Sequence, residues 1–85
     1  MIHNVKTKIL VHVIFFGRLA EITGYSHKDF TGMESTGRLI DHLHQMHPGL
    51  STVHYALAVD QKIVNNNTIL DHESTVAFMP PFSGG

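Results

Sequence analysis

The apolar run at residues 9–16, ILVHVIFF, restricts the possible folds of this chain more than any other feature. β-Branched and aromatic side chains fill both alternating sets of positions, which predicts a strand buried on both faces. A second compact strand is predicted at 75–79, TVAFM, and Pro80 ends it because proline lacks the N–H that pairing needs. We therefore expect these two segments to be the central strands of one sheet.

One long amphipathic helix is predicted between the two strands. Ser35 or Thr36 can cap its start, and Pro48-Gly49 ends it. Its apolar face follows the helical period and contains Leu39, Ile40, Leu43 and Met46.

Shorter elements complete the expected fold. Residues 18–22, followed by Gly24, predict one or two helical turns, and residues 25–31 are a weaker strand candidate. Segments 55–59 and 62–64 predict two short strands, with a turn at Asp60-Gln61. The order predicts an α+β fold of the β-grasp type, a mixed sheet with one main helix packed across it and a short additional helix. In that arrangement the first and last strands are parallel neighbours joined by a right-handed crossover.

The length of 85 residues predicts a single small domain. We expect residues 1–7 to be a flexible N-terminal leader, residues 8–81 to form the β-grasp domain, and residues 82–85 to be an extended tail ending in Gly-Gly. No apolar run approaches the roughly 20 residues of a membrane helix, so a membrane role is not expected. A net charge of -1 without a basic stripe also argues against nucleic-acid binding.

The chain contains no cysteine. It therefore lacks a thiolate nucleophile and the ligands of a cysteine-bound zinc site. Without disulfides or a secretion-signal pattern, a cytoplasmic location is the expectation.

Eight histidines are unusual for this length, and His42, His44 and His47 are close in sequence. Only His44 and His47 share a helix face, at a spacing of three residues, and no nearby ligand completes a tetrahedral site. We therefore expect no metal site. The other five histidines are scattered singly, and His12 is expected to have its polar atoms satisfied within the fold: His3, His12, His27, His54 and His72.

Serines and carboxylates form no recognisable catalytic arrangement, so we expect no complete active site in this chain. The end of the sequence suggests another kind of chemistry. Ser83-Gly84-Gly85 follows the stiff pair Pro80-Pro81, and glycine has no Cβ, so the Gly-Gly end can enter a narrow cleft. Residues 81–85 span about 17 Å when extended.

Large apolar side chains flank the base of this tail. Phe78, Met79 and Phe82 are close in sequence, and Phe16 ends the strand expected beside it. Because side chains alternate along a strand, either Phe78 or Met79 should be buried while the other is exposed. An exposed apolar patch here would be a docking surface.

Two segments together resemble a known family: VAFMPPFSGG at 76–85 and FFGRLAEITG at 15–24. They are similar to the small subunit of molybdopterin synthase, the MoaD family, and the likeness covers nearly the whole chain after residue 8. One departure lies before the last strand, where Glu73-Ser74-Thr75 replaces the Gly-Asp-Glu of many members. This difference affects the expected turn geometry there.

The resemblance implies a ubiquitin-like sulfur carrier that binds no cofactor itself. An ATP-dependent activating enzyme would adenylate the carboxylate of Gly85, and a sulfur donor would convert it to a thiocarboxylate. The tail, with Gly84 needed for access, would enter the large synthase subunit and deliver sulfur to cyclic pyranopterin monophosphate. Six residues are the expected partner contacts: Phe16, Ile63, Met79, Pro80, Pro81 and Phe82.

Two alternatives remain open at this stage. Sulfur carriers of the thiamine or tRNA-thiolation pathways also end in Gly-Gly, although the Pro-Pro-Phe-Ser approach favours the first interpretation. A ubiquitin-like modifier or a plain interaction domain is the third possibility.

Overall fold

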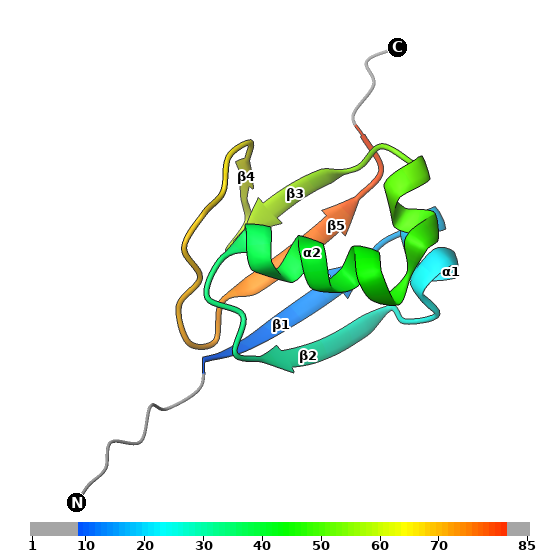
Figure 1. Cartoon of the computed structure of the whole chain (residues 1–85). Helices are drawn as coiled ribbons and strands as arrows, with labels where there is room; N and C mark the ends of the chain where they lie inside the picture. Colours follow the sequence, from blue (N-terminus) through cyan, green and yellow to red (C-terminus); the bar gives the residue numbers. More distant parts are fainter. Residues whose placement is uncertain (1–8, 82–85) are drawn as a thin grey trace, which may run out of the picture.

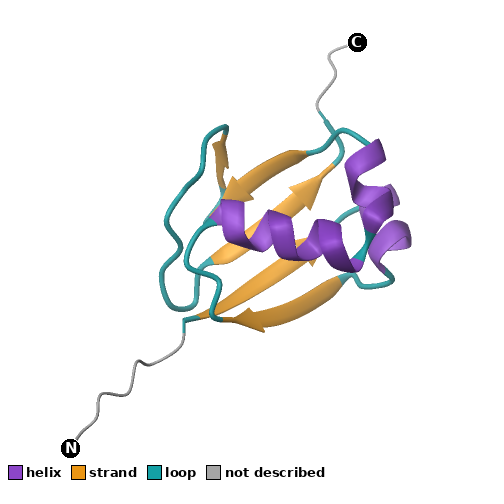
Figure 2. Cartoon of the chain, viewed as in Figure 1, coloured by secondary structure: helices purple, strands orange, loops and turns teal. Residues whose placement is uncertain are grey.

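The computed structural model describes residues 9–81, which form a five-stranded mixed sheet with helices on one face (Figures 1 and 2). The strand order is β2-β1-β5-β3-β4. The elements along the chain are β1 (Leu10–Phe15), α1 (Arg18–Thr23), β2 (His27–Thr31), α2 (Thr36–Met46), the 3-10 helix η1 (Pro48–Thr52), β3 (Ala56–Val59), β4 (Lys62–Val64) and β5 (Thr75–Met79). The predicted leader at 1–7 and the predicted tail at 82–85 lie outside the described residues, and so does residue 8.

The centre of the sheet is the parallel pair β1 and β5, in which Val13 lies opposite Val76. Strands β2, β3 and β4 join antiparallel to their neighbours. Helix α2 crosses one face of this sheet (Figure 2). The predicted β-grasp arrangement, with the first and last strands as central parallel neighbours, is therefore confirmed.

Only one face of the sheet is fully buried. In β1, Val11, Val13 and Phe15 point toward the helices and are at most 2% exposed, whereas Leu10 and Ile14 on the other face are half-buried. The prediction that β1 is buried on both faces is wrong, because all helices of the described segment pack against the same side (Figure 1). Apolar residues on the second face consequently form an accessible surface.

Phe78 of β5 lies at the centre of the core and is fully buried. Its ring centroid is 5.2 Å from that of Phe15 and 5.2 Å from that of Tyr55. Leu39 and Leu43 of α2 are also buried in this core. Burying a side chain of this size contributes roughly 1.5–3 kcal/mol, so the helix and the sheet stabilise each other.

Helix α2 begins as predicted, because the hydroxyl of Ser35 accepts a hydrogen bond from the backbone N–H of Arg38 at 3.2 Å. Met46 was assigned to the apolar face of this helix, but unlike Leu39 and Leu43 it is not buried and is 57% exposed. The chain turns directly into η1, which packs against α2, and Leu50 of η1 is fully buried. Leu50, rather than Met46, therefore closes the core at this end.

The predicted turn at Asp60-Gln61 is confirmed and joins β3 to β4. Both residues have positive φ, 49° and 73°, as the tight turns of antiparallel hairpins require. The turn sets the register in which Ala58 lies opposite Ile63. Among residues 9–81, no helix has the length and apolar character needed to cross a membrane.

Candidate functional site

An apolar groove runs along the face of the sheet that the helices leave open. Pairing places Ile63, Ala58, Ala77 and Ile14 in one row across four strands. Because the two central alanines are small, the larger side chains around them enclose a hollow of about 430 Å³. The groove is lined by Ile14, Phe16, Ala58, Gln61, Ile63, Thr75, Ala77 and Met79.

Three of the predicted partner contacts lie together in this groove. Phe16 and Ile63 are 48% and 50% exposed, and Met79 is half-buried. Phe78, the neighbour of Met79, is buried, as strand alternation predicted. Pro80 and Pro81 are exposed and follow β5 directly, whereas Phe82, Gly84 and Gly85 lie outside the described residues.

Phe16 and Gly17, which follow β1, contact the end of β5. The backbone N–H of Phe16 donates to the carbonyl of Phe78 at 3.0 Å. Gly17 follows with φ 57°, and a Cβ at this position would lie 3.3 Å from Cγ of Pro80. Glycine therefore permits both the left-handed backbone and the close approach of Pro80, which holds the start of the tail segment beside the groove.

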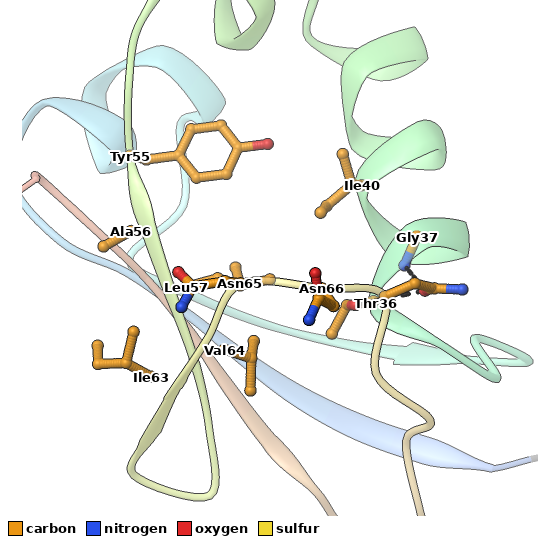
Figure 3. A pocket seen from close by; sticks show the side chains of 11 residues that line it. Thr36, Gly37, Ile40, Tyr55, Ala56, Leu57, Ile63, Val64, Asn65 and Asn66 are labelled. Carbon is orange, nitrogen blue, oxygen red and sulfur yellow. Dashed lines mark hydrogen bonds between the residues drawn. The ribbon is translucent and has the colours of Figure 1, made fainter.

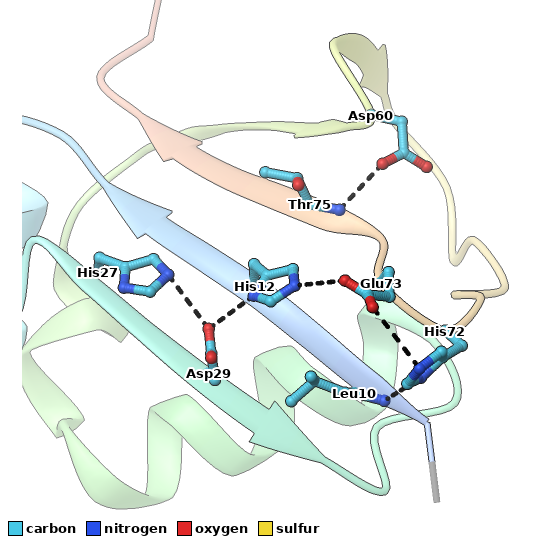
Figure 4. A network of polar contacts seen from close by, with 8 residues as sticks. All are labelled: Leu10, His12, His27, Asp29, Asp60, His72, Glu73 and Thr75. Atoms are coloured by element: carbon cyan, nitrogen blue, oxygen red, sulfur yellow. Dashed lines mark hydrogen bonds and ion pairs between the residues drawn. The ribbon is translucent and has the colours of Figure 1, made fainter.

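A polar network lies on the same face of the sheet, beyond Ile14 (Figure 4). Asp29 lies opposite His12 in the β1–β2 pair, and Asp29 Oδ1 is 2.8 Å from His12 Nδ1 and 3.1 Å from His27 Nε2. On its other side, His12 Nε2 is 3.1 Å from Glu73 Oε1. The expectation that His12 is satisfied within the fold is confirmed.

These contacts change the acidity of the groups involved. Hydrogen bonds to Glu73 and then to Asp29 raise the pKa of His12 above its usual value, because both carboxylates favour the imidazolium. The hydrogen bond from His12 lowers the pKa of Asp29 for the same reason. A neutral imidazole can donate from only one nitrogen, so both hydrogen bonds form together when His12 is protonated.

Glu73 occupies an unusual backbone conformation. Its φ is 71°, in the left-handed region that favours glycine. The resemblance implies glycine at this position, and the positive φ is kept although glutamate stands there. The side chain that glycine would lack is the one that contacts His12.

The helix histidines do not converge on one point. His44 Nε2 is 2.9 Å from the hydroxyl of Tyr55, which also meets its ring edge-on. The rings of His42 and His47 pack edge-on against Phe30 and Tyr25 respectively. Each of the three therefore faces a different aromatic side chain.

A second pocket, of about 350 Å³, lies between the start of α2 and the β3–β4 hairpin (Figure 3). Asn67, in the loop after β4, lines this pocket and contacts the start of α2. Its carboxamide oxygen accepts a hydrogen bond from the backbone N–H of Gly37 at 2.7 Å, and Thr68 N–H donates to the Thr36 hydroxyl at 2.9 Å. Asn67 thus satisfies a backbone N–H in the first turn of α2, a role that the sequence did not indicate.

The His12 network was not predicted from the sequence, in which His12, His27 and Glu73 lie far apart. His27 and Asp29 are two residues apart in a strand, so their side chains share one face. The sequence could therefore have indicated that the side chains of His27 and Asp29 lie close together. Their meeting with His12 and Glu73, however, depends on which strands pair and in which register.

The fold is of the β-grasp type, and an apolar groove lies beside β5, the strand that precedes Pro80-Pro81. The model of the ThiS family matches residues 13–85, so this chain belongs to the ThiS family. The resemblance found in the sequence is thereby confirmed at the level of the family.

Solved structures agree with this fold. A putative molybdopterin converting factor, subunit 1, from Pyrococcus furiosus superposes with a TM-score of 0.76 at 18% identity, covering 86% of this chain and 98% of its own. Small archaeal modifier protein 1 from Haloferax volcanii has a TM-score of 0.71 at 24% identity, covering 89% and 99%. The protein of the same name from Methanosarcina acetivorans has a TM-score of 0.73 at 19% identity, covering 94% and 100%. A comparison with curated protein sequences found no match.

Proposed function

We propose that this chain is the sulfur-carrying small subunit of molybdopterin synthase and that Gly85 carries the sulfur as a thiocarboxylate. The observation that carries the proposal is the apolar groove containing Phe16, Ile63 and Met79 at the start of the Pro-Pro-Phe-Ser-Gly-Gly segment. The name of the Pyrococcus furiosus structure, a putative molybdopterin converting factor subunit, supports the same assignment.

The proposed chemistry begins at the carboxylate of Gly85. A carboxylate is a poor electrophile, so an activating enzyme first joins one of its oxygens to the α-phosphorus of ATP and releases pyrophosphate. A hydrosulfide then attacks the acyl carbon and displaces AMP, which leaves a thiocarboxylate. If the donor is a persulfide, an acyl disulfide forms first, and a thiol reduces its S–S bond to release the thiocarboxylate. ATP belongs to the activating enzyme, and this chain contributes the acyl group.

In the second part of the proposal, the groove docks the large subunit of the synthase. Phe16 and Met79 would provide an apolar contact beside the tail, and Pro80-Pro81 would restrict the directions in which the tail leaves the domain. The five residues from Pro81 to Gly85 reach about 17 Å, far enough to enter a neighbouring active site. There the thiocarboxylate sulfur would form a bond to a carbon of cyclic pyranopterin monophosphate and displace an oxygen substituent. Water would then cleave the acyl–sulfur bond and return the Gly85 carboxylate, and two such rounds would build the dithiolene.

A second function is supported by the names of other structural neighbours. Small archaeal modifier protein 1 shares this fold, so a role as a protein modifier is the main alternative. In that case the activated carboxyl carbon of Gly85 would be attacked by a lysine amine, and an isopeptide bond would replace the bond to AMP. A sulfur carrier of the thiamine or tRNA-thiolation pathway is the other alternative.

Reconstitution with purified partners tests the proposal. Wild-type chain, the large subunit, the activating enzyme, ATP and a sulfur donor should together convert cyclic pyranopterin monophosphate to molybdopterin. Removing Gly85 should abolish product while leaving the amide NMR spectrum of residues 9–81 unchanged. Product formation at the wild-type rate after this deletion would refute the proposal.

A further inference from the structure

We propose that His12, His27 and Asp29 bind one zinc ion on the open face of the sheet, with Glu73 holding His12 in position. Three potential ligand atoms, two imidazole nitrogens and one carboxylate oxygen, all lie within 4.8 Å of one another. This proposal is independent of the tail and of sulfur transfer. It also departs from the expectation that the chain has no metal site.

The β1–β2 pairing brings the three side chains together. His12 lies opposite Asp29, and Ile14, two residues further along β1, lies opposite His27. His27 and Asp29 are themselves two residues apart, so both point to the same face as His12. The site is therefore built on two paired strands, and its geometry does not depend on a loop.

The distances are close to those of a zinc site. Zinc bonds of about 2.0–2.2 Å in a tetrahedral arrangement place neighbouring ligand atoms roughly 3.3 Å apart. Asp29 Oδ1 is already 2.8 Å from His12 Nδ1 and 3.1 Å from His27 Nε2. The two imidazole rings lie nearly parallel, with an interplanar angle of 17° and centroids 6.3 Å apart. His27 and Asp29 are exposed and therefore free to rotate toward an ion beside the partly buried His12, and all three side chains lie together on this face (Figure 4).

Glu73 supplies the outer contact that ligating histidines commonly have. When His12 Nε2 donates its proton to Glu73 Oε1, the lone pair of Nδ1 is directed toward Asp29 and is free to bind a metal. When His12 is protonated on both nitrogens, a proton lies between Nδ1 and Asp29 Oδ1. Zinc would replace that proton, keep the hydrogen bond to Glu73, and neutralise the adjacent carboxylates.

The surroundings favour a cation. Glu73 and Asp29 are both exposed, and His72 Nε2 is 3.9 Å from Glu73 Oε2. Lys28, the cation nearest in sequence to Asp29, has its Nζ 4.7 Å from the centroid of Tyr25 and lies on the opposite side of β2.

Imidazole and carboxylate ligands together suit zinc better than magnesium or calcium, which prefer oxygen alone. Three protein ligands leave a fourth position for water or a partner group.

The test uses the untagged full chain, freed of metal by a chelator and titrated with zinc sulfate in a calorimeter. One zinc ion should bind per chain, and NMR should show shifts centred on the rings of His12 and His27. Replacing His27 with alanine should lower zinc affinity at least as much as replacing Glu73 with glutamine, for which we expect a loss of roughly 10–100-fold. His54→Ala is the matched control, because His54 is exposed in the loop before β3, and it should leave affinity unchanged.

Lowering the pH should weaken binding, because zinc competes with the proton on His12. Amide NMR spectra of each variant establish that the fold is intact before its affinity is compared. The absence of saturable zinc binding by the wild-type chain would overturn the proposal. Equal affinity in His27→Ala and the wild type would also overturn it, as would loss of binding only in His42→Ala/His47→Ala.

Discussion

His12 in the middle of β1 and Glu73 in the turn before β5 are joined by a 3.1 Å contact between Nε2 and Oε1, although 61 residues separate them in the sequence. Because this hydrogen bond is the largest cause of the raised pKa of His12, we expect Glu73→Gln to lower that pKa toward 6.5. NMR titration of the His12 ring protons measures the change. Glu21→Gln on α1 is the control and should leave the pKa as in the wild type, whereas an unaltered pKa in Glu73→Gln would contradict the assignment.

The same network predicts a pH-dependent contribution to stability. A raised pKa of His12 stabilises the fold fully below the unfolded value of 6.5, and this contribution is lost as the pH rises through the folded value. The lowered pKa of Asp29 adds stability above 3.8 that is lost as the pH falls through its folded value.

Asp29→Asn should therefore reduce the free energy of unfolding most between the two reference values, 3.8 and 6.5. Urea denaturation across the pH range measures the difference between this variant and the wild type. A difference that stays constant from acid to alkaline pH would show that the pair makes no such contribution.

Asn67 and Gly37 should be energetically coupled. Asn67→Ala removes a hydrogen bond to the first turn of α2 and should cost about 1 kcal/mol, similar to the loss of a helix cap. In Gly37→Ala, the new Cβ would lie 2.8 Å from Asn67 Oδ1, which opposes the gain of about 1 kcal/mol that alanine normally brings to a helix. The gain should appear only in the Asn67→Ala background. A double-mutant cycle of unfolding free energies tests this, and additive effects would contradict the coupling.

The elements of the fold were largely predictable from local patterns. The apolar segments containing Val13 and Val76 indicated the central strands, and Ser35 indicated where α2 begins. The burial of these strands was harder to predict. Apolar residues at both the odd and the even positions of β1 fit a strand buried on both faces, but they also fit a sheet with one accessible apolar face. Met46 shows the same limit, since η1 supplies the buried Leu50 at that end of the helix.

Some residues of the candidate site could be predicted from the sequence, and others could not. Phe16 and Met79 could be associated with the tail from the sequence, since each is near the end of a predicted central strand. The meeting of His12 with Asp29 could not, because a strand pattern specifies a face but not the partner residue. Asn67 was missed for a related reason: its contact with α2 spans 30 residues of sequence.

The groove should contribute to binding of the proposed large subunit. Phe16→Ala and Met79→Ala should each weaken binding by about tenfold or more, because truncating an apolar anchor at an interface centre costs more than about 1 kcal/mol. Ile69→Ala is the control, since Ile69 is 74% exposed and is not among the groove residues. Calorimetric titration with the purified subunit measures all three. Equal losses in Ile69→Ala and Phe16→Ala would argue against a docking role for the groove.

The proposed sulfur-carrier function is tested most directly by the intact mass of the chain after incubation with the activating enzyme, ATP and a sulfur donor. We predict that one oxygen is exchanged for sulfur, that the change maps to Gly85 by fragmentation, and that the chain lacking Gly85 remains unmodified. An unchanged mass with an active enzyme, or isopeptide adducts to lysine without a sulfur-containing form, would contradict the account.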